Sequence, residues 1–374
     1  MNEDKAARYH RLRRRTSLLE HALATGALLL LLATGWSAGL RDWAMTAAGQ
    51  STVLAVAIYV LCIAFLVEAL QLPLAFYQGS VLERRYELST QATSRWWMDR
   101  FKSLLVGLPL LVLAAVVVWA LLRWSPDHWW YVASACFAAT LVLLAHLAPV
   151  WLLPLFSRCE PLQRPTLSRR LVTLAERAGT QVLGVFEWHV SDRTRKANAA
   201  LAGIGRTRRI LLSDTLLAEH SDDEVEVIVA HELAHHVHHD IWRAMAFESG
   251  LTLLGFYVAD RMLGVAVGHF GVTAKFDVAA LPLLVLAGGA VSLAFLPLVN
   301  AVSRIHERRA DRYALDLTGN PAAFTSAMKR LSARNLAEER PSRWVEVLFY
   351  RHPSIADRLD AAHAWDLARG SRPR

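Results

Sequence analysis

The sequence predicts a mainly α-helical protein that crosses a membrane about six times and carries a polar segment with a small β-sheet. Two observations lead to this fold class. First, 54% of the 374 residues are hydrophobic and only 20% are charged, whereas soluble domains carry about 25% charged residues. Second, the apolar residues gather in runs of the length that a helix needs to cross a bilayer. This composition excludes disordered, collagen-like and coiled-coil proteins.

Six apolar runs are candidate membrane spans. The run at 244–266 contains Asp260 and Arg261, which makes it the least typical of a span. A basic N-terminal segment before an apolar run is also typical of a cleaved signal peptide, but the length of the first run and the spans after it favour an uncleaved span. The six runs lie at 18–38, 52–77, 103–123, 130–156, 244–266 and 278–300.

These runs divide the chain into two regions. Residues 1–156 form an N-terminal transmembrane region with about four spans, and residues 157–374 form a second domain that the last two spans interrupt. Short strand-like patterns predict a sheet near 182–213, with strands expected at 197–203 and 209–213 on either side of a turn. The second domain is therefore expected to combine helices with a small β-sheet.

Basic residues orient the chain. The first 17 residues contain six Lys and Arg residues and the loop 78–102 contains five, whereas one each is found in the loops 39–50, 123–129 and 267–277. The positive-inside rule then places the N-terminus, the polar segment 157–243 and residues 301–374 on the cytoplasmic side. The net charge of +8 thus follows membrane topology, and it does not indicate nucleic-acid binding.

One helix carries a motif with chemical meaning. Residues 221–240 read SDDEVEVIVAHELAHHVHHD and open with the S-x-x-E pattern of a capping box. On this helix His231 and His235 are four residues apart, so both imidazoles share a face, with Glu232 beside them. This HExxH pattern is typical of zinc peptidases, in which the histidines bind the metal and the glutamate is the general base. The alternative interpretation is a His-rich, solvated helix end.

A catalytic zinc ion needs a third protein ligand and an open position for water. The three cysteines form no metal-binding pattern, so the ligand must be a histidine or a carboxylate. Residues 300–311, NAVSRIHERRAD, follow the last span on the same side of the membrane. Glu307 can bind the metal, and Asp311, one turn later on the same face, can accept the second N–H of a ligand histidine. Alone, this segment is equally typical of a charged helix that leaves a membrane.

HELAHH together with NAVSRIHERRAD resembles the type I CAAX prenyl endopeptidases, a family of integral-membrane zinc metalloproteases of the gluzincin group. Two departures from the family pattern, Ala234 and His236, lie off the ligand face, and the six spans compare with seven in the best-known eukaryotic members. The resemblance continues in order through VLERRYELSTQATSRWWMDRFK (81–102), LLPLFSRCEPL (152–162), SDRTRKANAALAGIGRTRRILLSDTLL (191–217) and RHPSIADRL (351–359).

The resemblance implies a membrane-embedded zinc metalloendopeptidase with a zincin-like domain and one Zn²⁺ per chain. From the residues alone, a turn histidine is the favoured interpretation of His352 and a turn former that of Asn198, and only the resemblance outweighs these interpretations. The implied site residues are the metal ligands His231, His235 and Glu307, the general base Glu232, the oxyanion-stabilising His352 with Arg358 supporting it or the substrate, Asp311 behind a ligand histidine, and Asn198, which would hold the substrate backbone.

The expected partners are a peptide or protein substrate, including a lipidated or membrane-associated one, and the lipid bilayer, but no nucleic acid. One alternative is a quality-control zinc protease of the heat-shock type. Segment 81–102 and the extra spans favour the CAAX-type family over this alternative. Another alternative is a membrane scaffold with a degenerate metal site. The intact set of candidate ligands disfavours it. The richness in Ala, Arg and Leu is typical of bacteria, so we expect the inner membrane, with the N-terminus and the active site on the cytoplasmic side.

Overall fold

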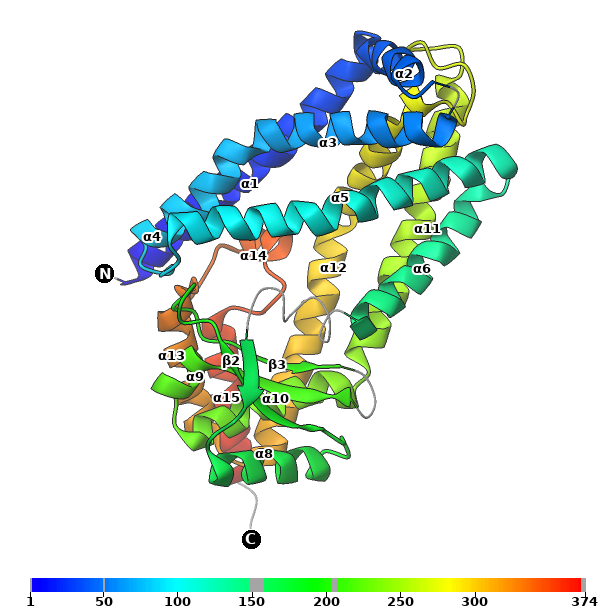
Figure 1. Ribbon diagram of the computed structural model, residues 1–374. Coiled ribbons are helices and arrows are strands. Elements are labelled where there is room, and N and C mark those ends of the chain that lie inside the picture. The colour runs from blue at the N-terminus through cyan, green and yellow to red at the C-terminus, as the bar shows by residue number, and fades with distance from the viewer. Residues whose placement is uncertain (1, 50, 148–157, 204–206, 371–374) are drawn as a thin grey trace.

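The computed structural model describes residues 2–49, 51–147, 158–203 and 207–370. It confirms a mainly helical chain with apolar helices of membrane-spanning length and one small sheet. In Figure 1 the long helices of the first half lie above the sheet, and two long helices, α11 (Asp240–Ala266) and α12 (Leu281–Thr318), connect the two parts. The sheet and the helices around it therefore form the lower part of one molecule, below the membrane helices.

Four helical stretches among the described residues are long and apolar enough to cross a membrane. Many of their leucine, valine and phenylalanine side chains point outward and are exposed, an arrangement that is favourable in lipid and unfavourable in water. The four stretches lie in α1 (Asn2–Ala33), in α3 (Thr52–Phe76) with its extensions η1 (Tyr77–Leu82) and α4 (Glu83–Arg85), in α5 (Thr93–Trp124), and in η4 (Val278–Ala280) with α12.

The other two predicted spans are helical as well. α6 (Trp129–Leu147) contains the start of the run predicted at 130–156, and residues 148–156 lie outside the described part of the chain. α11 contains the run 244–266 and packs against α6 and α12. Asp260 is tolerated inside α11 because it is buried and accepts hydrogen bonds from Trp129 Nε1 (2.9 Å) and Lys275 Nζ (3.0 Å).

The basic N-terminal residues belong to the first helix. α1 begins at Asn2, and its first turns lie against η1, against Glu83 at the start of α4 and against the residues after α4. Tyr9 is buried there in a small apolar cluster with Leu82, Tyr86 and Leu88. The segment that precedes the first apolar run in the sequence is thus a docked part of the fold.

The sheet has four strands in the order β1-β2-β4-β3. The parallel pair β2 (Gly184–His189) and β4 (Arg209–Ser213) forms its centre, and each takes an antiparallel neighbour, β1 (Arg158–Pro161) and β3 (Ala199–Ala202) respectively. The sheet agrees with the region predicted near 182–213 except for β1, whose four residues RCEP carry no apolar alternation that could have indicated a strand. β3 forms an edge of the sheet next to α10 (Asp222–Val237).

A single hydrophobic core joins the sheet to the helices below the membrane helices. α10 is its centre, because Val225, Val229 and Leu233 are almost completely buried. The end of α12 contributes Ala314 and Leu315 to the same core, which fixes α12 beside α10. The remaining helices around this core are α8 (Pro165–Arg177), α9 (Asp214–Glu219), α13 (Pro321–Asn335), α14 (Arg343–Phe349) and α15 (Ile355–Gly370).

Candidate active site

The helix α10 begins with the predicted capping box. Ser221 Oγ accepts from Glu224 N (3.3 Å), and Glu224 Oε2 accepts from Ser221 N (2.8 Å). Because the apolar residues of α10 face the core, the i and i+4 positions His231 and His235 share another face, with their ring centroids 5.0 Å apart. The local sequence thereby sets the direction of both imidazoles.

Glu307 on α12 faces these two imidazoles. One ligand atom from each of His231, His235 and Glu307 lies within 4.8 Å of the others. Glu307 Oε2 is 3.2 Å from His231 Nε2, and Glu307 Oε1 is 3.5 Å from His235 Nε2. Two ligands of a tetrahedral zinc ion, each about 2.0 Å from the metal, are about 3.3 Å apart. The three side chains therefore fit a zinc ion.

A buried oxygen gives a second indication of a metal site. Glu307 Oε2 is inaccessible to solvent, and the ring nitrogens near it, His231 Nε2 (3.2 Å) and His352 Nδ1 (2.8 Å), direct no N–H bond at it within the described residues. Buried carboxylate oxygens at which no N–H or O–H bond is directed are rare in folded proteins, and an unplaced ion is one of the usual reasons. The donor set of two imidazoles and one carboxylate is also one of the sets that catalytic zinc sites use.

Asp311 lies behind the first histidine. Its Oδ1 is 2.9 Å from His231 Nδ1, on the side of the ring opposite Nε2. Arg358 donates to both oxygens of Asp311, with Nε 2.8 Å from Oδ2, and its Nη2 comes within 3.5 Å of His231 Nδ1. Arg358 is thus placed behind the His231 ring, whereas the resemblance had implied that it supports His352 or the substrate.

Asp240 holds the second histidine and was missed in the sequence. It is buried, its Oδ2 is 3.1 Å from His235 Nδ1, and its Oδ1 accepts from Arg309. Each ligand histidine therefore has a carboxylate at Nδ1, and each carboxylate has an arginine behind it. The sequence feature that could have indicated this contact is the position of Asp240, five residues after His235. The left-handed conformation of His239 (φ 57°) turns the chain so that Asp240 lies next to the His235 ring.

The electrostatics of the site differ between its groups. Burial alone would lower the pKa of His231, but the carboxylates of Asp311 and Glu307 beside its two ring nitrogens outweigh burial and raise the pKa to about 10. Burial raises the pKa of the Glu232 carboxyl, and the two neighbouring imidazoles oppose this rise. A carboxylate with a raised pKa is a better proton acceptor near neutral pH, as general-base catalysis requires.

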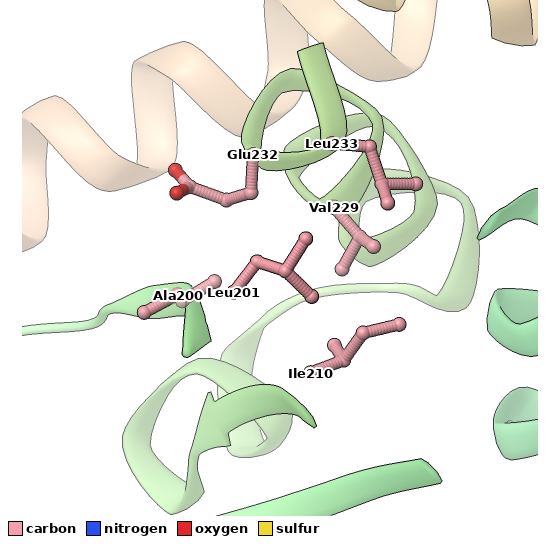
Figure 2. Close-up of a pocket in the computed structure, with 7 residues that line it drawn as sticks. Ala200, Leu201, Ile210, Val229, Glu232 and Leu233 are labelled. Atoms are coloured by element: carbon pink, nitrogen blue, oxygen red, sulfur yellow. The ribbon is translucent and has the colours of Figure 1, made fainter. Parts of the chain in front are cut away.

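Glu232 stands between the metal-binding face of α10 and the edge strand β3. Figure 2 shows its carboxylate pointing away from Val229 and Leu233, which belong to the same helix. Leu201 O in β3 accepts a hydrogen bond from His236 Nε2 (3.2 Å), and burial lowers the pKa of His236 to about 4, so this ring is neutral at pH 7. A small apolar pocket at this junction is lined by Ala199, Ala200, Leu201, Ile210, Val229, Glu232 and Leu233.

Asn198 is exposed and directly precedes β3. Ser213 N donates to Asn198 O (3.0 Å), and Asn198 N donates to Ser213 Oγ (2.9 Å). Backbone groups alternate in direction along an antiparallel strand, so the peptide groups of Ala199 and Leu201 point away from β4, toward the outer edge. The contact of Leu201 O with His236 agrees with this direction.

His352 reaches the site from the segment after α14. Its Nδ1 is 2.8 Å from Glu307 Oε2, and its side chain is 64% exposed. Two residues of α12 hold the backbone before it: Asn300 Nδ2 donates to Leu348 O (2.8 Å) and Arg304 Nη1 donates to Tyr350 O (2.7 Å). The structure thus brings His352 to the solvent side of the three ligand groups.

Comparison with known proteins decides the family. The family model described as peptidase family M48 matches residues 161–366. The chain belongs to peptidase family M48. A second model, described as the CAAX prenyl protease N-terminal region with five membrane helices, matches residues 2–158 of this M48 peptidase. The resemblance recognised in the sequence is confirmed.

Relatives and a solved structure agree with this assignment. The M48 peptidase is 31% identical to YhfN, an uncharacterised metalloprotease of Bacillus subtilis, over 89% of this chain and 79% of the relative. It is 27% identical to CAAX prenyl protease 1 of Saccharomyces cerevisiae, over 78% of this chain and 68% of the relative. The crystal structure of S. mikatae Ste24p shares its fold, with a TM-score of 0.85 and 23% identity over 96% of this chain and 88% of that chain. The protein is a multi-pass membrane metalloprotease.

Proposed function

We propose that this M48 peptidase is a zinc endopeptidase in which His231, His235 and Glu307 hold one Zn²⁺. The convergence of their three ligand atoms within 4.8 Å carries the proposal. When bound, zinc lowers the pKa of a water molecule and polarises the substrate carbonyl. Residues 157–374 would then be the peptidase domain and residues 1–156 its transmembrane region.

The protein side chains supply the proton transfer and the orientation. Glu232, beside both ligand histidines, would take the proton of the attacking water and later deliver it to the leaving amine. His352, on the open side of Glu307, would donate a hydrogen bond to the oxyanion that forms at the carbonyl. Asp311 and Asp240 would fix the tautomer of the ligand histidines, with the proton on Nδ1 and Nε2 free for the metal.

The edge strand β3 would hold the substrate backbone. An extended peptide can add to a sheet edge through main-chain hydrogen bonds. The backbone N–H and C=O groups of Ala199 point away from β4, in the direction that this pairing requires. β3 consists of Ala-Ala-Leu-Ala, so its small side chains let a second backbone come close. Asn198 would hold the peptide at the start of β3, next to Glu232.

The substrate class that we propose is a prenylated C-terminal peptide of the CAAX type, presented from the membrane. One relative is named CAAX prenyl protease 1, and the N-terminal half matches the membrane region of such proteases. The Lys and Arg distribution supports an active site on the cytoplasmic side, and the richness in Ala, Arg and Leu supports a bacterial inner membrane. Cysteine labelling of the 78–102 loop against the 123–129 loop in intact cells would test this orientation.

The deciding experiment is peptidase activity of the purified protein on a fluorogenic farnesylated CaaX peptide. An unprenylated peptide, the Glu232→Gln variant and bound zinc would be measured in parallel. Glu226→Gln is the matched control, because Glu226 is on the same helix but pairs with Arg170 away from the site. We expect farnesyl-dependent cleavage that falls by about 10²–10⁴-fold in Glu232→Gln, with zinc retained, and wild-type activity in Glu226→Gln.

Other outcomes would change the conclusion in defined ways. Zinc-dependent cleavage of both peptides at equal rates would keep the endopeptidase and remove the lipidated substrate. Stoichiometric zinc without cleavage of either peptide would direct the search toward misfolded membrane proteins. Wild-type protein that binds no zinc would overturn the proposed function.

A further inference from the structure

We infer that the basic N-terminal part of α1 positions His352 through a hydrogen-bonded cluster of Arg14, Glu338 and Tyr350. This role rests on the function proposed above for His352. From the sequence, this segment is expected only to flank a membrane span. The inferred role makes it a part of the peptidase. Arg14 would be a positioning residue, because it acts through Tyr350 and does not touch the substrate.

The three side chains are mutually bonded. Tyr350 Oη donates to Glu338 Oε2 (2.6 Å), and Arg14 Nη1 donates to the same oxygen (3.0 Å) and to Tyr350 Oη (3.1 Å). The side chains of Arg14 and Glu338 are only 19% and 12% exposed, so solvent screens this pair less than an ordinary surface ion pair. Burial and the bond to Glu338 raise the pKa of Tyr350, so its hydroxyl, which is already protonated at neutral pH, stays a donor over a wider pH range.

α1 contacts the same region at a second point. His10 Nε2 is 2.8 Å from Leu336 O, and the His10 ring lies 5.9 Å from the Tyr350 ring. Leu336 also packs against the cluster around the buried Tyr9. The loop that carries Glu338 is therefore held by more than one residue of α1, and the contact with Arg14 is part of a docked surface.

This cluster bears on His352 because Tyr350 is held from two sides. α1 holds its side chain, and Arg304 on α12 holds its backbone oxygen. In Figure 1, α14, which ends just before Tyr350, lies beside α12 and beneath the membrane helices. His352 follows two residues later and is mostly exposed, so its place over Glu307 depends on how firmly the preceding residues are fixed. A misplacement of about 1 Å in a catalytic group can cost about 100-fold in rate.

The test compares steady-state constants of metal-loaded variants on the peptide that the wild type cleaves. The variants are Tyr350→Phe, Arg14→Leu, His352→Ala and the double variant Tyr350→Phe/His352→Ala. Arg11→Leu is the matched control, because Arg11 is exposed on the same helix and its loss changes the charge of the membrane flank equally. Hydrogen exchange of residues 343–353 and bound zinc are measured for each protein, since both readouts are independent of activity.

We expect Tyr350→Phe and Arg14→Leu to lower kcat by about 10–100-fold, with KM within about twofold and zinc unchanged. Exchange of residues 343–353 should become faster in both variants and stay at the wild-type rate in Arg11→Leu. The double variant should be no slower than His352→Ala alone, because two changes that act through one group are not additive.

The outcomes separate this inference from the proposed function. Wild-type kcat in His352→Ala would remove the proposed role of His352 itself. A low kcat in His352→Ala together with wild-type kcat in Tyr350→Phe would overturn the positioning role alone. Effects that multiply in the double variant, or a Tyr350→Phe protein that has lost zinc, would likewise show that Tyr350 acts by another route.

Discussion

Asp240 Oδ2 lies 3.1 Å from His235 Nδ1, and Asp311 Oδ1 lies 2.9 Å from His231 Nδ1. The two proposed zinc ligands of α10 are therefore held in the same way, although one carboxylate comes from α11 and the other from α12. Both histidines are thereby fixed before a metal arrives. With a metal bound, the site would follow the carboxylate–histidine–metal arrangement on two of its three proposed ligands.

Removal of Asp240 should weaken metal binding. We expect Asp240→Ala to lower zinc affinity by about 10–100-fold, because His235 would lose the acceptor that fixes its ring and Arg309 would be left beside it without a carboxylate. Competition with a chelator of known affinity measures the effect, and the exposed Asp360→Ala is the control. Equal affinity in Asp240→Ala and the wild type would show that Asp240 has no part in the site.

The pH dependence of metal binding has a defined sign. In the metal-free protein the pKa of His231 is raised to about 10, so the ring carries a proton at neutral pH that zinc must displace. Apparent zinc affinity should therefore rise with pH between about 6 and 8, by about tenfold per unit for this one proton. Chelator competition at three pH values checks the slope, and an affinity that stays constant or falls as pH rises would contradict the assignment of His231.

Arg358 offers a choice between two roles that give different results. If it acts behind the site, Arg358→Met should lower stability by about 3–5 kcal/mol, because Asp311 would lose its partner in a buried pair, and zinc affinity should fall with it. If Arg358 instead supported the oxyanion, kcat would fall while zinc content and unfolding temperature stayed the same. Arg312→Met, at an exposed position of α12, is the control for the unfolding and zinc measurements.

His236 should affect substrate binding more than chemistry. Its hydrogen bond to Leu201 O ties β3 to α10, and a net loss of one hydrogen bond costs about 0.5–1.5 kcal/mol. We therefore expect His236→Leu to raise KM by about 3–10-fold with a smaller change in kcat, and His236→Gln to restore part of the loss. A fall in kcat at unchanged KM would place His236 in the chemical step instead.

The main features of the fold and the metal site could be predicted because they depend on local periodicity. The apolar runs predict the long helices, and the i, i+4 spacing alone places His231 beside His235. Glu307 could be proposed because its helix had to leave the membrane on the same side as α10. Each of these inferences needs only helix geometry and the distribution of basic residues.

The rest depends on angles between elements that are far apart in sequence. Asp240 reaches His235 only because His239 adopts a left-handed conformation and turns the chain between α10 and α11. The side of His231 on which Arg358 lies depends on how α15 packs against α12. Arg14 and Glu338 are 324 positions apart, and no local pattern in either segment indicates that they meet.

The 38 residues of α12 form one uninterrupted helix from the apolar stretch to Glu307 and Asp311. A soluble enzyme could therefore not be made by cutting the chain at the membrane boundary, because the cut would remove the scaffold that presents Glu307, the proposed third ligand. Any water-soluble version would have to keep every helix and exchange its lipid-facing residues for polar ones. For the same reason, the two halves of this protein would have to be inherited together, since a recombination event that joined α12 to a different bundle would alter the geometry around the metal.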